Sequence, residues 1–287
     1  MTRAAHELGV TQPALSAAVR KLEESVGLPL LNRTARGVEP TEAGRVFLKF
    51  ADDAVRAAEG GVRAVREIAG LQSGSIRVGG GATAITYLLP SVIGRFVHEH
   101  PGVRFFVREA GSNAVARSVL SGELDLGVIT LPLTESGSRD LLAIPLARDE
   151  LLLIVPPSHK LAGKRTFRWS DVDGEATVAF EDGSAVRDLI DQSARRAGVS
   201  LKVVMELRSI ESIKSMVAAG VGIGFVSSFA LAARDGLNCA EGDLARALAI
   251  IRRHDHTPGP ASAAFERMLT QSIRSPQRGR ATARPTE

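Results

Sequence analysis

The pattern of apolar and polar positions changes twice along the chain. From Leu15 to Val26, apolar residues recur at intervals of four, three and four positions, which is the spacing of one buried face of a helix. Residues 41–71 carry a longer apolar stripe of the same period, and from Ile76 onward short apolar runs alternate with helical segments. The pattern therefore predicts a small helical part, one long helix and an α/β part, in that order.

The segment Thr2–Thr34 has the pattern of two short helices joined by a tight turn and followed by an extended arm. Gly9 permits the left-handed backbone of a tight turn, and Thr11 suits the N-cap of the second helix. Pro13 then falls in the first helical turn, where its missing N–H costs nothing. This arrangement is typical of a helix-turn-helix protein that reads duplex DNA.

Polar groups that suit DNA lie on the second helix and on the arm. A Gln can pair with adenine through two hydrogen bonds, and Ser and Arg can reach bases or phosphates. Leu30–Thr41 is predicted to form a wing whose arginines contact phosphates or the minor groove. A solvated helix face and a solvated loop are the alternative interpretations of these two segments. The predicted DNA contacts are Thr11, Gln12, Pro13, Ser16, Arg20, Arg33 and Arg36.

The run from Thr11 to Gly44, TQPALSAAVRKLEESVGLPLLNRTARGVEPTEAG, resembles the winged helix-turn-helix of LysR-type transcriptional regulators almost position by position. One departure is Ala17, where the family often has Arg, and it implies weaker or shifted base readout. The family also has about one more helix before the position of Thr2. The resemblance therefore predicts that the first helix is missing from residues 1–40, that the natural start lies upstream, and that this form binds operator DNA poorly.

Thr41 is predicted to cap a helix that runs to about Leu71, a length of about 45 Å at 1.5 Å per residue. A small domain cannot cover so long an apolar stripe, so a second copy of the chain is expected to pair with it. In LysR-type regulators the corresponding helix, residues 41–72 here, is the dimer linker. Gly60 and Gly61 predict a kink or break within it, and residues 71–75 a hinge after it. The residues predicted to form the dimer interface are Val46, Phe47, Phe50, Ala54 and Ala57.

Alternating strand and helix patterns after Ile76 predict an α/β domain with largely parallel sheets. The resemblance implies a two-lobed effector domain similar to a periplasmic binding protein, with a ligand cleft between the lobes. We expect the effector domain over 76–273, with 76–147 plus 251–273 in one lobe and 148–250 in the other, then a disordered tail, 274–287. The predicted strands are 76–78, 103–108, 124–129, 151–155, 177–180 and 223–226, and the predicted helices are 85–98, 114–120, 185–196, 211–219 and 261–273.

Hydroxyl side chains follow several of the predicted strands. Ligands of α/β sheets bind beyond the carboxyl ends of the strands, and helix N-termini at those ends favour anions. Three hydroxyls at three strand ends suit a small carboxylate or oxyanion, and matching hydroxyl residues line the effector cleft in the LysR family. Each hydroxyl could instead be a helix cap or a turn residue. The predicted effector contacts are Gly81, Thr83, Ala84, Thr130 and Ser184, with Ser209 and Ile210 as weaker candidates.

Composition and charge change this picture little. The 287 residues have room for two or three domains, and the formal net charge of +4 is only mildly basic. The single cysteine, Cys239, cannot form an internal disulfide and suits a reducing cytoplasm. No apolar run approaches the length of a membrane span. The pair His254 and His256 lacks a third metal ligand, and the glycines at 79–81 lack the spacing of a phosphate loop.

These features together predict a cytoplasmic LysR-type transcriptional regulator without a cofactor or metal. It is expected to bind duplex DNA and a small anionic metabolite, to form a homodimer or homotetramer, and to act on RNA polymerase. One alternative is a small-molecule binding protein whose DNA-binding half is non-functional through N-terminal truncation. Another is an α/β enzyme, which the lack of a catalytic constellation disfavours. Salt-dependent binding to duplex DNA distinguishes the first two possibilities.

Overall fold

The computed structural model describes residues 1–34, 37–68, 74–133, 138–232 and 235–274. The chain forms two compact units, Met1–Val62 and Arg63–Glu287. Arg36, part of the predicted hinge and the predicted tail beyond residue 274 lie outside the described residues. None of the helices in the described part of the chain is both long and apolar enough to cross a membrane.

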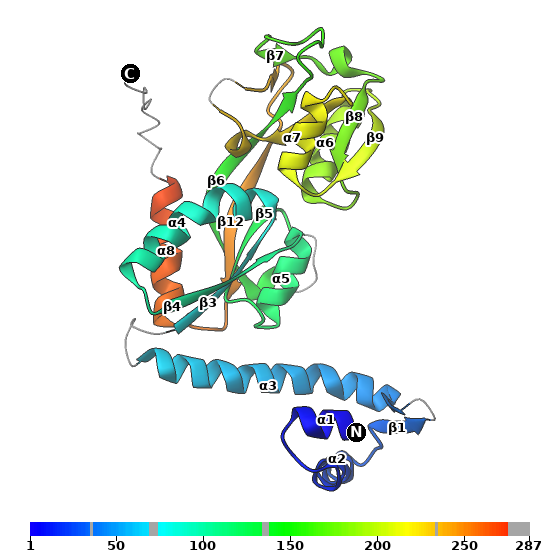
Figure 1. The fold of residues 1–287 in the computed structure, drawn as a ribbon, viewed down its shortest axis with the longest axis vertical. Coiled ribbons are helices and arrows are strands. Elements are labelled where there is room, and N and C mark those ends of the chain that lie inside the picture. The colour runs from blue at the N-terminus through cyan, green and yellow to red at the C-terminus, as the bar shows by residue number, and fades with distance from the viewer. Residues whose placement is uncertain (35–36, 69–73, 134–137, 233–234, 275–287) are drawn as a thin grey trace. The chain divides into compact units, whose positions relative to one another are not determined.

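The first unit contains the predicted helix-turn-helix and wing (Figure 1). The Thr11 hydroxyl caps the second helix by accepting a hydrogen bond from the Ala14 N–H at 3.4 Å. Glu23 Oε1 accepts from the N–H groups of Leu30, at 2.7 Å, and Leu31, at 3.0 Å, and so fastens the wing to that helix. The elements are α1 (Thr2–Glu7), α2 (Gln12–Val26) and an antiparallel pair, β1 (Leu31–Thr34) and β2 (Gly37–Pro40).

The apolar face of α2 is only partly buried, so the predicted buried face is wrong toward its C-terminal end. Leu22 and Val26 are each 38% exposed. The cause is a lack of cover, because the buried apolar side chains among the described residues of this unit are Ala5 and Leu30. The packing of α2 is therefore thin, and its local caps and hydrogen bonds matter correspondingly more.

The long helix α3 (Glu42–Ile68) begins as predicted, because the Thr41 hydroxyl accepts a hydrogen bond from the Gly44 N–H at 2.9 Å. Gly44 is required there, since a Cβ would lie 2.0 Å from the Leu30 carbonyl oxygen. The predicted break at Gly60 and Gly61 is absent, and the helix continues through both. A glycine costs about 1 kcal/mol relative to alanine but keeps its N–H, so the hydrogen-bond ladder can continue.

The second unit is built on one eight-stranded sheet with the strand order β4-β3-β5-β12-β6-β10-β8-β9. The outer pairs are parallel, whereas β12 pairs antiparallel with β5 and β6, and β6 pairs antiparallel with β10. The prediction of largely parallel sheets therefore holds at the two ends and fails in the middle. The strands are β3 (Gly74–Gly80), β4 (Val103–Glu109), β5 (Leu126–Leu131), β6 (Leu141–Ile154), β8 (Ala176–Phe180), β9 (Lys202–Leu207), β10 (Ile223–Ser227) and β12 (Ala245–Arg253), with a small pair of β7 (Thr166–Phe167) and β11 (Asn238–Cys239).

Two long strands, β6 and β12, run from one lobe into the other (Figure 1). The first lobe gathers β3, β4, β5, α4, α5 and α8, and the second gathers β8, β9, β10, α6 and α7. The helices are η1, a π-helix (Ala84–Leu88), α4 (Leu89–Glu99), α5 (Ser112–Leu120), α6 (Ala185–Arg196), α7 (Ile210–Ala218) and α8 (Pro260–Arg274), with 3-10 turns at Ser138–Asp140, Trp169–Val172 and Ser228–Ala230.

Each lobe has its own apolar core. In the first lobe, α8 returns to the sheet as predicted, and Phe265 meets Phe96 edge to face at 5.4 Å. In the second, Trp169 and Phe225 stack at 5.7 Å. The predicted lobe boundary is wrong at one end, because residues 247–250 pair with β5 and so belong to the first lobe.

Candidate functional site

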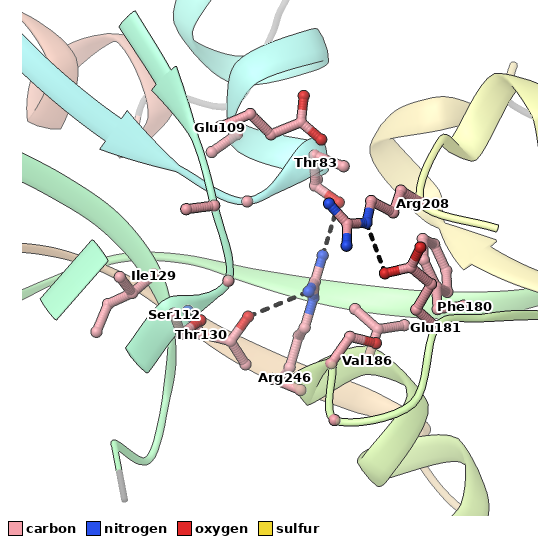
Figure 2. A pocket seen from close by; sticks show the side chains of 18 of the residues that line it. Thr83, Glu109, Ser112, Ile129, Thr130, Phe180, Glu181, Val186, Arg208 and Arg246 are labelled. Atoms are coloured by element: carbon pink, nitrogen blue, oxygen red, sulfur yellow. Dashed lines mark hydrogen bonds and ion pairs between the residues drawn. The ribbon is translucent and has the colours of Figure 1, made fainter. Parts of the chain in front are cut away.

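A cavity of about 620 Å³ lies at the carboxyl ends of the strands, with walls from both lobes (Figure 2). The five residues predicted to contact an effector all line it, namely Gly81, Thr83, Ala84, Thr130 and Ser184. The further candidates Ser209 and Ile210 do not line it, and Ser209 instead caps α7 by accepting from the Ser212 N–H at 3.3 Å. The structure thus brings together residues that are far apart in the sequence.

Three helix starts meet at this cavity: the π-helix η1 that continues into α4, α5 and α6. The Ser112 hydroxyl accepts from the Thr130 N–H at 3.0 Å, which ties the start of α5 to the end of β5. The Ser184 hydroxyl caps α6 by accepting from the Arg187 N–H at 3.2 Å. Helix starts carry free N–H groups and partial positive charge, so this wall of the cavity favours anions.

Arg246, on β12, is the centre of the site, although sequence reasoning missed it. Its side chain is 7% exposed and forms an ion pair at 2.8 Å with Asp149 on β6, which is fully buried. The guanidinium also donates to the Thr83 hydroxyl at 2.7 Å and to the Thr130 hydroxyl at 3.1 Å (Figure 2). Asp149 accepts in addition from the Ser227 hydroxyl at 2.7 Å. Arg246 therefore joins both lobe-connecting strands to two of the predicted effector contacts.

The alternative interpretation of the Thr83 hydroxyl, as a helix cap, is wrong. Thr83 precedes η1, but its side chain makes no capping hydrogen bond to that helix. The Thr83 oxygen accepts instead from Arg246, whose charged guanidinium is a stronger donor than a backbone N–H. Since the Thr83 and Thr130 oxygens accept from Arg246, their own hydrogens remain available to donate into the cavity.

The second-lobe wall is more open to solvent. Arg208 lines the cavity and forms an ion pair with Glu181 at 2.5 Å, with side chains that are 82% and 43% exposed. Behind this wall, Arg187 donates to the Phe180 carbonyl at 2.9 Å and pairs with Asp191 at 2.8 Å. The Arg187 pKa is raised, because the hydrogen bonds and charges of its carboxylate partners outweigh the opposing effect of burial. This network holds the end of β8 at the cavity.

A second contact joins the lobes next to the cavity. Tyr87 in η1 donates a hydrogen bond to Glu211 at the start of α7, and Glu211 also pairs with Lys214 at 3.1 Å. Burial and the contact with Glu211 raise the Tyr87 pKa above its usual range, while the hydrogen bonds from Tyr87 and Lys214 lower the Glu211 pKa. Because η1 begins at Ala84, the last residue of the cavity loop 81–84, a displacement of that loop would move Tyr87 and change this contact.

In the first unit, the predicted DNA contacts fall into two groups. Pro13 and Arg20 are exposed on α2. Ser16, by contrast, is only 6% exposed and accepts a hydrogen bond from Gln12 Nε2 at 2.7 Å, so its predicted base contact is corrected to a supporting role for Gln12. The helical spacing of four between the two residues brings them together. Of the others, Thr11 caps α2, Arg33 lies in β1, and Arg36 lies outside the described residues.

The predicted dimer stripe lies on α3. Val46, Phe50, Ala54 and Ala57 are exposed, and Phe47 is half-buried. Phe50 is 69% exposed and Val46 is 55% exposed, so the stripe leaves neighbouring apolar side chains uncovered, as interaction surfaces do.

Metal and thiol chemistry find little support in the described part of the chain. No group of three or more His, Cys, Asp or Glu side chains in it could hold a metal ion. Burial raises the pKa of the Cys239 thiol, which disfavours the reactive thiolate form.

Two family models match the chain. The model described as "Bacterial regulatory helix-turn-helix protein, lysR family" matches residues 1–45, and the model described as "LysR substrate binding domain" matches residues 69–274. A probable RuBisCO transcriptional regulator of Synechocystis sp. (strain ATCC 27184 / PCC 6803 / Kazusa) is 33% identical over 274 residues, which cover 92% of this chain and 79% of that protein.

Solved structures show the same fold. A full-length variant of OxyR from Pseudomonas aeruginosa is 26% identical, with a TM-score of 0.69 over 95% of this chain and 89% of that one. The regulatory domain of CcmR from Synechocystis PCC6803, solved in complex with 2-PG, is 24% identical, with a TM-score of 0.64 over 71% of this chain and 99% of that one.

Proposed function

The chain belongs to the LysR family of DNA-binding transcriptional regulators, and from this premise we propose that its effector is a small organic anion bound at Arg246 between the lobes. The observation that carries the proposal is the arrangement of Arg246, Thr83 and Thr130 at the cavity wall. Arg246 lines the cavity, whereas its ion-pair partner Asp149 does not. The positively charged member of the buried pair is therefore the one that a ligand would meet.

An anion at this wall would receive three kinds of favourable interaction. The two threonine hydroxyls donate hydrogen bonds, the guanidinium supplies charge, and the helix starts supply N–H groups. Gly81, Ala84 and Ser184 line the same space and would contact the ligand directly. The complex of the similar CcmR domain with 2-PG supports a small ligand for this fold.

The position of Arg246 also supports a mechanism for transmission. Arg246 and Asp149 lie on β12 and β6, the strands that connect the lobes, and Ser227 ties the pair to β10 in the second lobe. A ligand that accepts hydrogen bonds from the Thr83 and Thr130 hydroxyls would change the contacts that these residues make with Arg246 on β12. We expect it to shift the population of lobe arrangements, as allosteric ligands do through their differential affinity.

For the first unit, we propose that α2 enters the major groove with Gln12, Pro13 and Arg20 toward the DNA, and that Arg33 and Arg36 of the wing contact the backbone. The exposed stripe of α3 would pair with α3 of a second copy, in a dimer or tetramer that acts through RNA polymerase.

The test is a conservative substitution at the centre of the site. Arg246→Lys keeps the charge but cannot hold both threonines and Asp149 with a planar fork. We expect calorimetric titration with a series of two- to six-carbon carboxylates and phosphorylated acids to show about a tenfold loss of affinity. Arg252→Lys is the matched control, because Arg252 lies on the same strand but pairs with Glu266 away from the cavity. Equal affinities for wild type and Arg246→Lys would contradict the proposal.

A further inference from the structure

The charges in the cavity wall do not balance. Arg208 is paired with Glu181, and Arg246 is paired with Asp149, which lies behind the wall. The two remaining acidic side chains have no hydrogen-bond or ion-pair partner among the described residues. The charged residues that line the cavity are Arg208, Arg246, Glu109, Glu181 and Asp182, so the unpaired ones are Glu109 and Asp182.

The two unpaired carboxylates come from different lobes. Glu109 ends β4 in the first lobe, and Asp182 lies between β8 and α6 in the second. Figure 2 shows Glu109 well apart from Arg246, with Thr83 drawn between them. The cavity therefore has one pole that donates hydrogen bonds to an acid and, apart from it, Glu109, which can only accept them, while Asp182 adds a second acceptor from the other lobe.

We propose that the effector carries hydrogen-bond donors at a distance from its acidic group, and that Glu109 and Asp182 select for them. This rests on the function proposed above, which places the acidic group at Arg246. The ligand is then a small amino acid or hydroxy acid, whose ammonium or hydroxyl faces the carboxylates. A dicarboxylate or bisphosphate would instead bring a second negative charge toward two groups that are already negative.

Solvent weakens this selection in the empty cavity, because both carboxylates are exposed and hydrated. A bound ligand displaces part of that water, after which a carboxylate that faces a like charge loses its hydration without gaining a partner. Glu109 and Asp182 act together, since each contributes one negative charge from its own lobe. Neutralising both is therefore expected to change selectivity more than neutralising either.

The experiment uses the full chain and acids of two to six carbons with four different end groups: methyl, hydroxyl, ammonium and carboxylate. Binding is detected by thermal shift and measured by calorimetry. In the wild type we expect the ammonium or hydroxyl acid to bind about tenfold more tightly than the dicarboxylate of equal length. In Glu109→Gln/Asp182→Asn the dicarboxylate should gain affinity and the amino acid should lose it, so that the ratio falls to about twofold or less.

The arms of this experiment separate the possible outcomes. The double variant should weaken an amino acid far more than a hydroxy acid, because the amides keep an acceptor oxygen but lose the charge. Glu150→Gln removes an exposed carboxylate outside the cavity lining and should leave every ratio unchanged.

A wild-type preference for dicarboxylates overturns the inference, as does a preference for the ammonium acid over the dicarboxylate that survives unchanged in the double variant. If the acids bind with the same affinity to Arg246→Lys and to wild type, it is the proposed anion site that fails. If none of them binds the wild type, both fail. Acid binding that requires Arg246 but ignores Glu109 and Asp182 refutes the inference alone.

Discussion

The cavity region holds two arginine–carboxylate pairs, one on the strands that connect the lobes and one in the second lobe, and they differ in burial, in hydrogen bonding and in position. Arg246–Asp149 is buried, hydrogen-bonded to four hydroxyl groups and located on the strands that connect the lobes. Arg208–Glu181 is exposed, and its distance of 2.5 Å indicates a single charge-assisted contact at the rim. By distance alone, the exposed pair would be expected to contribute more to the free energy of unfolding. Burial reverses this order, because solvent screens the exposed pair, whereas removing one partner of the buried pair leaves an uncompensated buried charge.

The largest effect is therefore expected from breaking the buried pair. Asp149→Ala leaves the Arg246 charge buried with only neutral hydroxyl partners and should lower the free energy of unfolding by about 3–5 kcal/mol. Urea denaturation followed by tryptophan fluorescence would measure it, since the single tryptophan lies in the core of the second lobe. Glu181→Ala provides the comparison from the exposed pair. Similar losses of unfolding free energy in Asp149→Ala and Glu181→Ala would mean that burial does not determine how much each ion pair contributes to stability.

A second substitution shows whether a half-buried polar side chain acts in binding rather than in stability. Gln12→Ala, in the DNA-reading unit, should cost about 1–3 kcal/mol on a specific operator fragment and almost nothing on random DNA. Anisotropy titrations at several salt concentrations would measure both, with DNA from upstream of the protein's own gene and Ser25→Ala as a control at the other end of α2. A wild type without salt-dependent DNA binding would favour the alternative of a small-molecule binding protein.

Local features of this molecule could be predicted from its sequence, because neighbouring residues alone determine them. Thr11 and Thr41 both cap the helices that follow them, as their residue types indicate. The rule for strand ends also located one wall of the cavity at Thr83, whereas Thr130 lines the cavity from within β5, which runs one residue beyond it. Such features require only a few adjacent residues and a general preference of the backbone.

Arg246 could not be found in this way, because its partners are distant in sequence. Asp149 lies 97 residues before it, and both strands mix polar with apolar residues, so neither β12 nor the first half of β6 was predicted. One signal was available. Arg246 stands at the start of the mostly apolar run Ala245–Ile251, and a charge in a strand that is about to be buried needs a partner. Ser16 shows the converse, since this residue of the predicted polar face is buried and accepts a hydrogen bond from Gln12.

The contact between Tyr87 and Glu211 is less buried than the pair Arg246–Asp149 and less exposed than the pair Arg208–Glu181. Its contribution to stability should therefore lie between theirs. Tyr87→Phe removes one hydrogen bond to a carboxylate and should cost about 1 kcal/mol of unfolding free energy at neutral pH. The Glu211 pKa is lowered in the folded state, so its contribution is present above its ordinary value of 4.5 and is lost as the pH falls through the lowered value. The difference between variant and wild type should therefore shrink in acid. Denaturant midpoints at pH 7 and pH 3.5 would measure it, and a constant difference would contradict the assignment.

The smallest effect on stability is expected at the exposed pair. Arg208→Ala removes a side chain that is 82% exposed, so the lost attraction to Glu181 is screened by water and offset by regained side-chain freedom. The free energy of unfolding should change by less than about 1 kcal/mol, and the change should vanish in 1 M salt, where the screening length is about 3 Å. Since Arg208 also lines the cavity, its loss leaves Glu181 as a third unpaired carboxylate there. Binding of acids should then weaken although folding is unaffected. A stability loss as large as that of Asp149→Ala, at either salt concentration, would show that the rim pair supports the fold as the buried pair does.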